Sequence, residues 1–588
     1  MLGRIRLRFF VTLLLVTACG SSAVTACRSS DPDPQDAEPP PPRDAAFDAR
    51  RDASPDASPD AGPDGSADSS ADARLDGSAD SSTDSSTDAR PDSGPDGSAD
   101  ASPDAQDGGD AGPPPATITP GAANRFLLTG TVVTPDVAFD GQVLVENALI
   151  TCVMPGVGCS GEPGAAGATL IETRGVIAPG LIDTHNHILF DIFDDDDWLP
   201  MATYVNHDQW PNEPRYQAML DVKQCLENAS QGKPAWCALS TYGNTAGHIK
   251  CEMDKWGELK GMIAGTTSIV GLPGTTAACF SSLSRSIDAP QNGLGTDRIQ
   301  TSALFPPSRS SADGVCNNFA LARTDSYLIH VGEGVDARSL AEFARLGTVS
   351  TVPGCLYAPQ TVITHGTAFT LAEFQAMAAA GMKLTWSPKS NVALYNATTN
   401  IPAALAAGVM ITLAPDWSMG GSQNMMDEMR FADAWDNVHF GDVLTPRDIV
   451  HMATKNPAIA LALQDRIGSI AVGHMADLMV VTPTSADPFA SIVQARPKSV
   501  RLTMIGGKIL FGDAQLKSAG PAAPGCEDID ICGASKFVCV AEASAANKLN
   551  QTYAQIKAIL DTAMADVDAL TPGDGYDFAP LTPLVKCN

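Results

Sequence analysis

Residues 175–187 read GVIAPGLIDTHNH, a strand-like apolar run that ends in two histidines. Alternate residues of an extended strand share one face, so His185 and His187 can offer two imidazoles to one ion. Imidazole nitrogen together with a carboxylate suits zinc or ferrous iron. The pair alone is ambiguous, because two core histidines can equally be satisfied by hydrogen bonds.

Three further apolar runs end in the same way. His330 follows SYLI, His365 follows TVIT, and Asp416 closes the run VMITLAP. In a parallel barrel the carboxyl ends of all strands open into one shared mouth, so groups that are distant in sequence converge there. The five strand-end residues together predict a catalytic metal site with one open position.

The middle of the chain, residues 176–464, alternates short apolar runs with helical stretches, which favours a parallel α/β barrel. Three of the helices are expected at 340–345, 371–380 and 424–435. Seven strands are evident, and the fourth is not obvious between Phe305 and Thr324. The seven expected strands are 181–187, 266–270, 299–304, 327–330, 361–365, 382–386 and 409–414.

Short strands with turn signals flank this middle on both sides, at residues 119–175 and 465–515. They predict one small β-sandwich built from both flanks. The expected fold class is therefore a (β/α)8 TIM-type barrel with this small domain. Residues 516–588 form a cysteine-rich C-terminal extension with a helix expected at 545–570.

The N-terminus carries the features of an export signal. Three arginines, an apolar run and small residues precede Cys19, so residues 1–18 are expected to be a signal peptide. The stretch VTAC resembles a bacterial lipobox, which implies lipidation of Cys19; a second copy at Cys27 lies further from the apolar run. We expect an exported, membrane-anchored lipoprotein of the outer membrane, facing the periplasm or the cell surface.

Residues 19–118 cycle through Asp, Ala, Ser, Pro and Gly with almost nothing to bury, and they predict a disordered linker. Residues 31–116 hold 22 acidic residues against 5 arginines, which is more than half of the excess behind the formal net charge of -30. The rest of the chain is only moderately acidic. Nucleic acid is therefore excluded as a partner, and oligomeric state stays open.

Twelve cysteines follow Cys27, and an even number in an exported chain favours disulfides. Cys152 and Cys159 flank a short turn and can bridge locally, whereas the other pairings cannot be deduced. A zinc site at Cys526, Cys532 and Cys539 is the rival interpretation, but these spacings do not match zinc knuckles.

Beyond these local patterns, an ordered set of motifs resembles the amidohydrolase superfamily, in the branch of cytosine, triazine and S-adenosylhomocysteine deaminases. The resemblance covers about two thirds of the chain and implies a (β/α)8 barrel with a small β-sandwich. Besides GVIAPGLIDTHNH, the motifs that carry the resemblance are LLTGTVVTPD, ELKGMIAGTTSIV, HVGE, ITHGT, WSPKSN, APDWS and NPAIALALQDRIGSIAVGHMADLMVV.

The resemblance also implies a role for each site residue. One divalent metal, zinc or iron, would be held by His185, His187, His330 and Asp416. Glu333 matches a proton-shuttling glutamate, His365 matches a substrate-contacting histidine, and Asp416 would take a proton from the attacking water. Residues Trp386 and Asn391, in WSPKSN, occupy a place that shapes the substrate pocket in relatives.

The implied reaction is metal-dependent hydrolysis of a non-peptide carbon–nitrogen bond in a cyclic amide, amidine or aminated heterocycle. Glu333 and His365 favour deamination of a small-molecule substrate. Ring opening, as in imidazolonepropionase, and a catalytically inactive surface binding protein are the alternatives. Asp191 and residues 194–197 follow the first strand; we expect a solvated acidic loop, and a preference for cationic substrates is the speculative interpretation. Substrate identity stays open.

Overall fold

A computed structural model describes residues 114–587, except 230–231, 272–282, 290–291, 297, 303–304, 523–524, 542–549 and 572–574. The predicted signal peptide, Cys19, Cys27 and nearly all of the predicted linker lie outside the described residues. Within the described residues, no helix is both long enough and apolar enough to cross a membrane.

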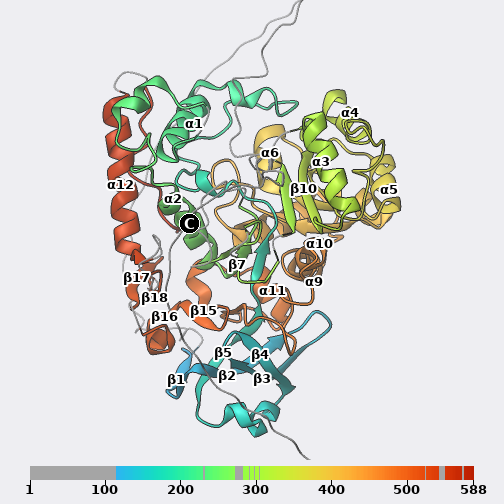
Figure 1. Ribbon diagram of the computed structural model, residues 1–588. Helices are drawn as coiled ribbons and strands as arrows, with labels where there is room; N and C mark the ends of the chain where they lie inside the picture. The colour runs from blue at the N-terminus through green and yellow to red at the C-terminus, as the bar shows by residue number, and fades with distance from the viewer. Residues whose placement is uncertain are drawn as a thin grey trace, which may run out of the picture. The chain divides into compact units, whose positions relative to one another are not determined.

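Eight parallel strands, of which β7 and β10 are labelled in Figure 1, make up the barrel. They form one ladder of three strands and one of five, in the order in which they follow along the chain. The last strand closes onto the first, because His187 N donates to Asp416 O at 2.7 Å and Asp416 N donates to His185 O at 3.2 Å. Among the described residues no ladder joins β8 to β9. The barrel strands are β6 (Leu181–Asp183), β7 (Thr266–Ile269), β8 (Arg285–Ser286), β9 (Ile299–Ser302), β10 (Ser326–Val331), β11 (Thr361–His365), β12 (Lys383–Trp386) and β13 (Met410–Leu413).

The strand that the sequence did not reveal is the third, not the fourth. It is β8, whereas the interval in which we expected it contains helix α3 (Arg309–Ala320). β8 was not recognised because it contains no apolar run. Polar side chains at and beside this strand are buried together with hydrogen-bond partners. Arg285 makes two hydrogen bonds to the Asp477 carboxylate, at 2.7 and 3.0 Å, and Ser284 donates to a backbone carbonyl of β7 at 2.9 Å.

Strands from both flanks of the barrel pair in one ten-stranded sheet. Its central strand β5 pairs with β2 from the N-terminal flank and with β14 from the C-terminal flank. β5 continues into the first barrel strand through Gly180, where a Cβ would lie 2.2 Å from the Thr267 side chain. The strands of this sheet are β1 (Thr117–Thr119), β2 (Ala122–Val133), β3 (Ala138–Glu146), β4 (Leu149–Pro155), β5 (Ala168–Pro179), β14 (Leu478–Val481), β15 (Val500–Ile505), β16 (Lys508–Asp513), β17 (Glu527–Ile531) and β18 (Ala534–Val538).

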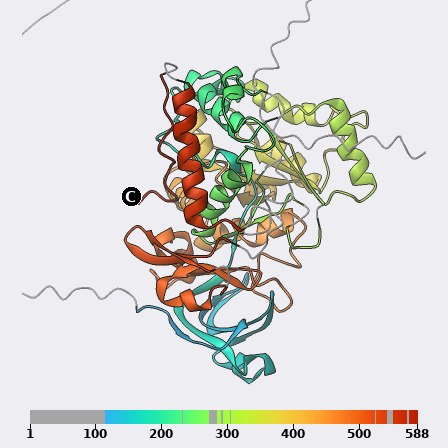
Figure 2. The ribbon, with the colours of Figure 1, turned by 60° about the vertical axis from the view of Figure 1, so that its left-hand side comes forward.

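The C-terminal extension contributes the last two strands of that sheet and the long helix α12 (Tyr553–Leu570), which runs along the barrel (Figure 2). α12 begins eight residues later than the sequence predicted, where Thr552 and Gln555 form a capping box. Tyr553 stacks on Trp256 of α2 with ring centroids 6.2 Å apart. The other helices are α1 (Pro214–Leu226), α2 (Lys250–Met262), α4 (Ala337–Leu346), α5 (Leu371–Ala379), α6 (Pro388–Tyr395), α7 (Ile401–Ala407), α8 (Met425–Trp435), α9 (Pro446–Met452), α10 (Lys455–Ala460) and α11 (Pro488–Val493).

Disulfides join the cysteines as the sequence favoured. The local bridge between Cys152 and Cys159 is present, with its Cα atoms 5.8 Å apart. The three cysteines of the rival zinc interpretation are each bonded elsewhere or to one another, so that interpretation is wrong. The further pairs among the described residues are Cys225–Cys237, Cys316–Cys355, Cys526–Cys539 and Cys532–Cys587.

Candidate active site

All five predicted strand-end residues meet at one mouth of the barrel. His185 and His187 follow β6, His330 and His365 close β10 and β11, and Asp416 follows β13. His365 and Asp416 both have φ of 72°, in the left-handed region that non-glycine residues rarely adopt. The two backbone hydrogen bonds that join Asp416 to His185 and His187 hold it in this strained conformation. Such strain is typical of functional sites.

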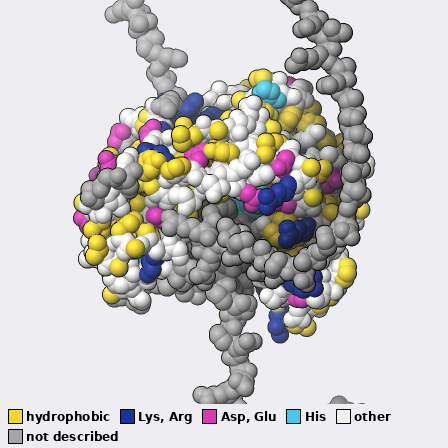
Figure 3. All heavy atoms as spheres, turned by 90° about the horizontal axis from the view of Figure 1, so that it is seen from above, with side chains coloured by type: hydrophobic (Ala, Val, Ile, Leu, Met, Phe, Trp, Pro, Cys, Tyr) yellow, Lys and Arg dark blue, Asp and Glu magenta, His cyan; other side chains and the backbone are white. Residues whose placement is uncertain are grey.

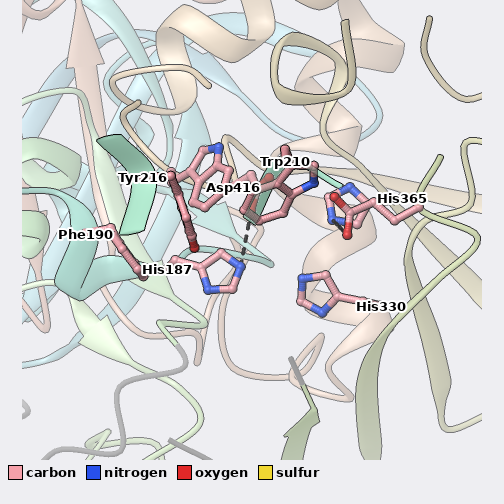
Figure 4. A pocket seen from close by; sticks show the side chains of 9 residues that line it. His187, Phe190, Trp210, Tyr216, His330, His365 and Asp416 are labelled. Carbon is pink, nitrogen blue, oxygen red and sulfur yellow. Dashed lines mark ion pairs between the residues drawn. The ribbon is translucent and has the colours of Figure 1, made fainter. Parts of the chain in front are cut away.

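The ring and carboxylate atoms lie within reach of a single ion (Figure 4). His185 Nε2 is 2.9 Å and His187 Nε2 is 3.5 Å from the same oxygen, Oδ1, of Asp416. The His330 ring lies 4.5 Å from the His185 ring, centroid to centroid. Two groups of potential ligands share His185: one adds His187 and Asp416, the other adds His330 and His365.

The chemistry of these side chains fits a divalent metal. Burial lowers the pKa of His185 and of His330 to about 3, so both rings are neutral and can offer a lone pair. His330 Nδ1 donates to Ser302 O at 3.2 Å, because a carbonyl can only accept, and this leaves Nε2 free as a ligand atom. Ser390 donates to Asp416 Oδ2 at 2.6 Å and leaves Oδ1 facing the histidines.

Glu333 and His365 face each other beside this cluster. His365 Nε2 lies 3.8 Å from Glu333 Oε2, and the other oxygen, Oε1, accepts a hydrogen bond from the Tyr395 hydroxyl at 2.8 Å. Burial raises the pKa of Glu333 to about 7, and the nearby charge of Asp416 adds to this shift. A carboxyl with such a pKa can both donate and accept a proton near neutral pH.

Trp386 and Asn391, which we predicted to shape the substrate pocket, are not among the side chains that line it. Both are fully buried. The Asn391 amide donates to His365 Nδ1 at 3.0 Å. Since neutral imidazole carries one proton, that proton is on Nε2, which is the atom that faces Glu333. Trp386 Nε1 donates to Thr398 at 2.7 Å, and Thr398 in turn bonds the Asn391 carbonyl at 3.4 Å.

Four aromatic side chains complete the pocket, and the sequence reasoning missed all of them. Trp417 stands next to Asp416 in the motif APDWS, a position that could have been noticed. The others lie in or after loops that follow β6, where no periodicity marks them. The pocket is lined by His187, Phe190, Trp210, Tyr216, His330, Glu333, His365, Asp416 and Trp417 (Figure 4).

The acidic segment after β6 is only partly the solvated loop that we expected, because Asp196 is exposed and Asp195 is half-buried. Asp191, Asp194 and Asp197 are buried. Asp194 accepts a hydrogen bond from Thr582 and forms an ion pair with Lys586 at 3.0 Å, so residues of the C-terminal extension neutralise it. Carboxylates engaged in this way are not available to a cationic substrate.

His207, to which the sequence assigned no role, helps to hold the loop that carries Glu333. His207 Nε2 bonds Glu342 Oε1 at 2.7 Å, and Glu342 Oε2 accepts from Gly332 N at 2.7 Å. Val335 N also donates to Val205 O at 2.8 Å. The segment after β6 is thereby fastened to the loop after β10.

On the face in Figure 3, basic side chains lie beside acidic and hydrophobic ones.

A parallel barrel that gathers histidines and an aspartate at its carboxyl-terminal mouth has the architecture of a barrel metallohydrolase. Residues 319–510 match the model of the amidohydrolase family. Over this third of its length the chain is similar to the amidohydrolase family, whose members bind a metal.

The curated relatives agree with this assignment. A 5'-deoxyadenosine deaminase of Methanothermobacter thermautotrophicus is 26% identical over 402 residues, which are 64% of this chain and 90% of the relative. A 5-methylthioadenosine/S-adenosylhomocysteine deaminase of Desulfitobacterium hafniense is 25% identical over 416 residues, with 64% and 90% covered. Both of these relatives are deaminases by name, which is the class of reaction that the sequence motifs imply.

Solved structures show a weaker likeness. A zinc-bound adenosine deaminase from Xanthomonas campestris has a TM-score of 0.46 and 19% identity, covering 65% of this chain and 92% of its own. A guanine deaminase of E. coli has a TM-score of 0.44 and 15% identity, covering 66% and 98%. The barrel described above rests on its own strand pairing and not on these scores.

Proposed function

We propose that this protein hydrolyses the carbon–nitrogen bond of an aminated heterocycle and releases ammonia. The observation that carries the proposal is the position of Glu333 and His365. Their facing atoms are 3.8 Å apart, in a pocket that His187, His330 and Asp416 also line. A proton donor and a hydrogen-bond donor thus flank the metal-binding groups, as loss of an amine from a tetrahedral carbon requires.

The resident ion is proposed to be a single zinc or ferrous iron, held by His185, His187, His330 and Asp416. Among the described residues, no lysine follows β9, the fourth barrel strand, so a carbamate bridging two ions has no candidate there. When bound, the ion supplies Lewis acidity, which lowers the pKa of water toward neutrality. His365 is proposed to contact the substrate and not the ion. Asn391 donates to its Nδ1, so the ring proton is on Nε2, and a protonated nitrogen cannot bind a metal.

The side chains divide the proton transfers between them. Asp416 accepts a proton as water adds to the sp2 carbon that bears the amine. The Nε2–H of His365 then donates a hydrogen bond to the group that gains charge on that carbon. Glu333 transfers its proton to the amine nitrogen; the carbon–nitrogen bond breaks and ammonia leaves, while the new carbon–oxygen bond remains in the product.

The pocket walls favour a flat ring. Trp210, Tyr216 and Trp417 pack edge to face or tilted against one another, with centroids between 5.0 and 6.2 Å apart, and all three border the pocket. Aromatic faces bind heterocycles by offset stacking and dispersion. This supports an aminated heterocycle over an open-chain amide.

The test is ammonia release from a panel of aminated purines, pyrimidines and triazines by residues 119–588, reconstituted with zinc or iron. Coupled detection of ammonia together with a mass change of one unit in the product would support deamination. A gain of one water without loss of ammonia would instead identify ring opening, the alternative chemistry. Absence of turnover in a fully metallated protein would favour a binding function.

We also propose that the protein works outside the cytoplasm, anchored through a lipid on Cys19. The export-like N-terminus and the lipobox resemblance support this, and disulfides are typical of exported chains. Intact-mass analysis of the mature protein should find an acylated N-terminal Cys19, and Cys19→Ala should release the protein from the membrane fraction. An unmodified, membrane-free wild type would contradict the proposal.

A further inference from the structure

Tyr395, at the end of α6, connects Glu333 to the aromatic wall of the pocket. Its hydroxyl lies 2.8 Å from Glu333 Oε1 and 3.0 Å from Trp210 Nε1. All three side chains are buried, with Tyr395 and Trp210 each 3% exposed. Glu333, Tyr395 and Trp210 thus form one hydrogen-bonded chain inside the molecule.

The direction of this chain follows from the chemistry of indole. Trp210 Nε1 carries a hydrogen and no lone pair for hydrogen bonding, so it can only donate. The Tyr395 oxygen must therefore accept from Trp210, and its single proton is left to point at Glu333 Oε1. Glu333 Oε1 is consequently an acceptor, and a proton on this carboxyl must reside on Oε2.

Oε2 is the oxygen that faces the reaction. It lies 3.8 Å from His365 Nε2, whereas Oε1 is turned toward α6. Without the Tyr395 hydroxyl, the proton could occupy either oxygen and the carboxyl could rotate. With it, the acidic hydrogen is directed to the oxygen nearest the substrate position.

We propose that Tyr395, anchored by Trp210, is a positioning residue that reserves Oε2 of Glu333 as the proton-donating oxygen. This inference rests on the proposed role of Glu333 in protonating the amine. Tyr395 itself does not contact the reacting atoms: among the described residues that line the pocket, it is absent.

Tyr395→Phe tests the proposal, because it keeps the buried ring and removes only the hydroxyl. We expect kcat to fall about tenfold, the size of one lost hydrogen bond to a carboxyl, with KM within about twofold and metal content unchanged. Tyr357→Phe is the matched control. The Tyr357 hydroxyl donates a hydrogen bond of 2.5 Å to Phe343 O, and neither residue lines the pocket. An unchanged kcat in Tyr395→Phe, or an equal loss in the control, would overturn the proposal.

Trp210→Phe supplies a second test that a purely structural role would not satisfy. It preserves an aromatic wall but removes the donor that sets the direction of the Tyr395 hydroxyl. We expect a fall in kcat of about threefold in the wild-type background and no further fall when it is added to Tyr395→Phe. Additive losses in the double variant would contradict a chain that acts as one unit.

A neutron structure of the deuterated wild type separates this inference from the proposed function, since it needs no turnover. Below about pD 7, deuterium on Glu333 Oε2 and a Tyr395 deuteron directed at Oε1 would support the positioning role even if no heterocycle is deaminated. Deuterium on Oε1 would refute it even in an active deaminase.

Discussion

The two sides of the pocket are constructed differently. The proposed metal ligands stand at or directly after the ends of barrel strands, and backbone pairing fixes them, as for Asp416 between His185 and His187. Glu333, Tyr395 and Trp210 come from a loop, a helix end and a short 3-10 turn (Trp210–Asn212), and side-chain hydrogen bonds fix them. The first side depends on fold, whereas the second depends on a few polar contacts that single substitutions can remove.

The largest effect is expected on the strand-end side. His185→Ala and Asp416→Ala should each abolish stoichiometric metal binding and lower kcat/KM by roughly a thousandfold or more. Elemental analysis of the purified variants, paired with the ammonia assay, measures both effects. His439→Ala, which removes a histidine stacked on Trp435 outside the pocket, is the control. Full metal content in either strand-end variant would contradict the assigned ligands.

Glu333→Gln should separate the two sides from each other. The amide keeps the size of the carboxyl but cannot deliver a proton, so kcat should fall by roughly 10² to 10⁴ while metal content stays at the wild-type level. A loss of less than about tenfold would remove Glu333 from the proton transfer. Loss of metal would show that the two sides are not independent.

Ser390→Ala should weaken the strand-end side without destroying it. Ser390 donates to the Asp416 oxygen that faces away from the histidines, and loss of such a support typically lowers metal affinity about 10-fold to 100-fold. Competition with a chelator measures the Kd. Ser387→Ala is the matched control, because this neighbouring buried hydroxyl has no hydrogen-bond partner in the described residues. Equal effects in both variants would argue for lost packing instead.

The smallest effect concerns the loop side and its dependence on pH. Burial lowers the pKa of His207, but the hydrogen bond to Glu342 and the charges of Glu333 and Glu342 outweigh it and raise this pKa from 6.5 to about 9. A raised folded-state pKa stabilises the fold below pH 6.5, and this contribution is lost as pH rises through about 9. Wild-type Tm should therefore decrease over this interval.

His207→Gln should have a lower Tm than the wild type at about pH 6.5 and approach it above about pH 9. Differential scanning calorimetry at matched ionic strength measures the difference. A constant difference in Tm across this range would show that the ion pair with Glu342 does not stabilise the loop.

The sequence predicted the part of the site that strands build. An apolar run followed by a histidine or aspartate marks a barrel strand and its ligand together, and each such residue was placed at the mouth. β8 was not predicted, because Arg285 and its neighbouring serines are polar and form hydrogen bonds to buried partners. No run of apolar residues exists there to be recognised.

The loop side could not be predicted, because its contacts join residues with no sequence relation. Tyr395 and Glu333 are 62 positions apart, and Trp210 and Tyr395 are 185 apart. Trp386 and Asn391 were recognised by their motif, but the motif did not reveal that they orient His365 from behind. The acidic segment was misinterpreted for the same reason: its burial depends on Thr582, 388 positions from Asp194.

That last contact has a consequence for the order of events during synthesis. Asp194 follows the first barrel strand, yet Thr582, which donates a hydrogen bond to it, is made 388 positions later, and Lys586 follows Thr582. At about 5–20 residues per second, some tens of seconds separate the synthesis of the two ends of this contact. The segment after β6 therefore acquires these contacts only after residues 582–586 have been made.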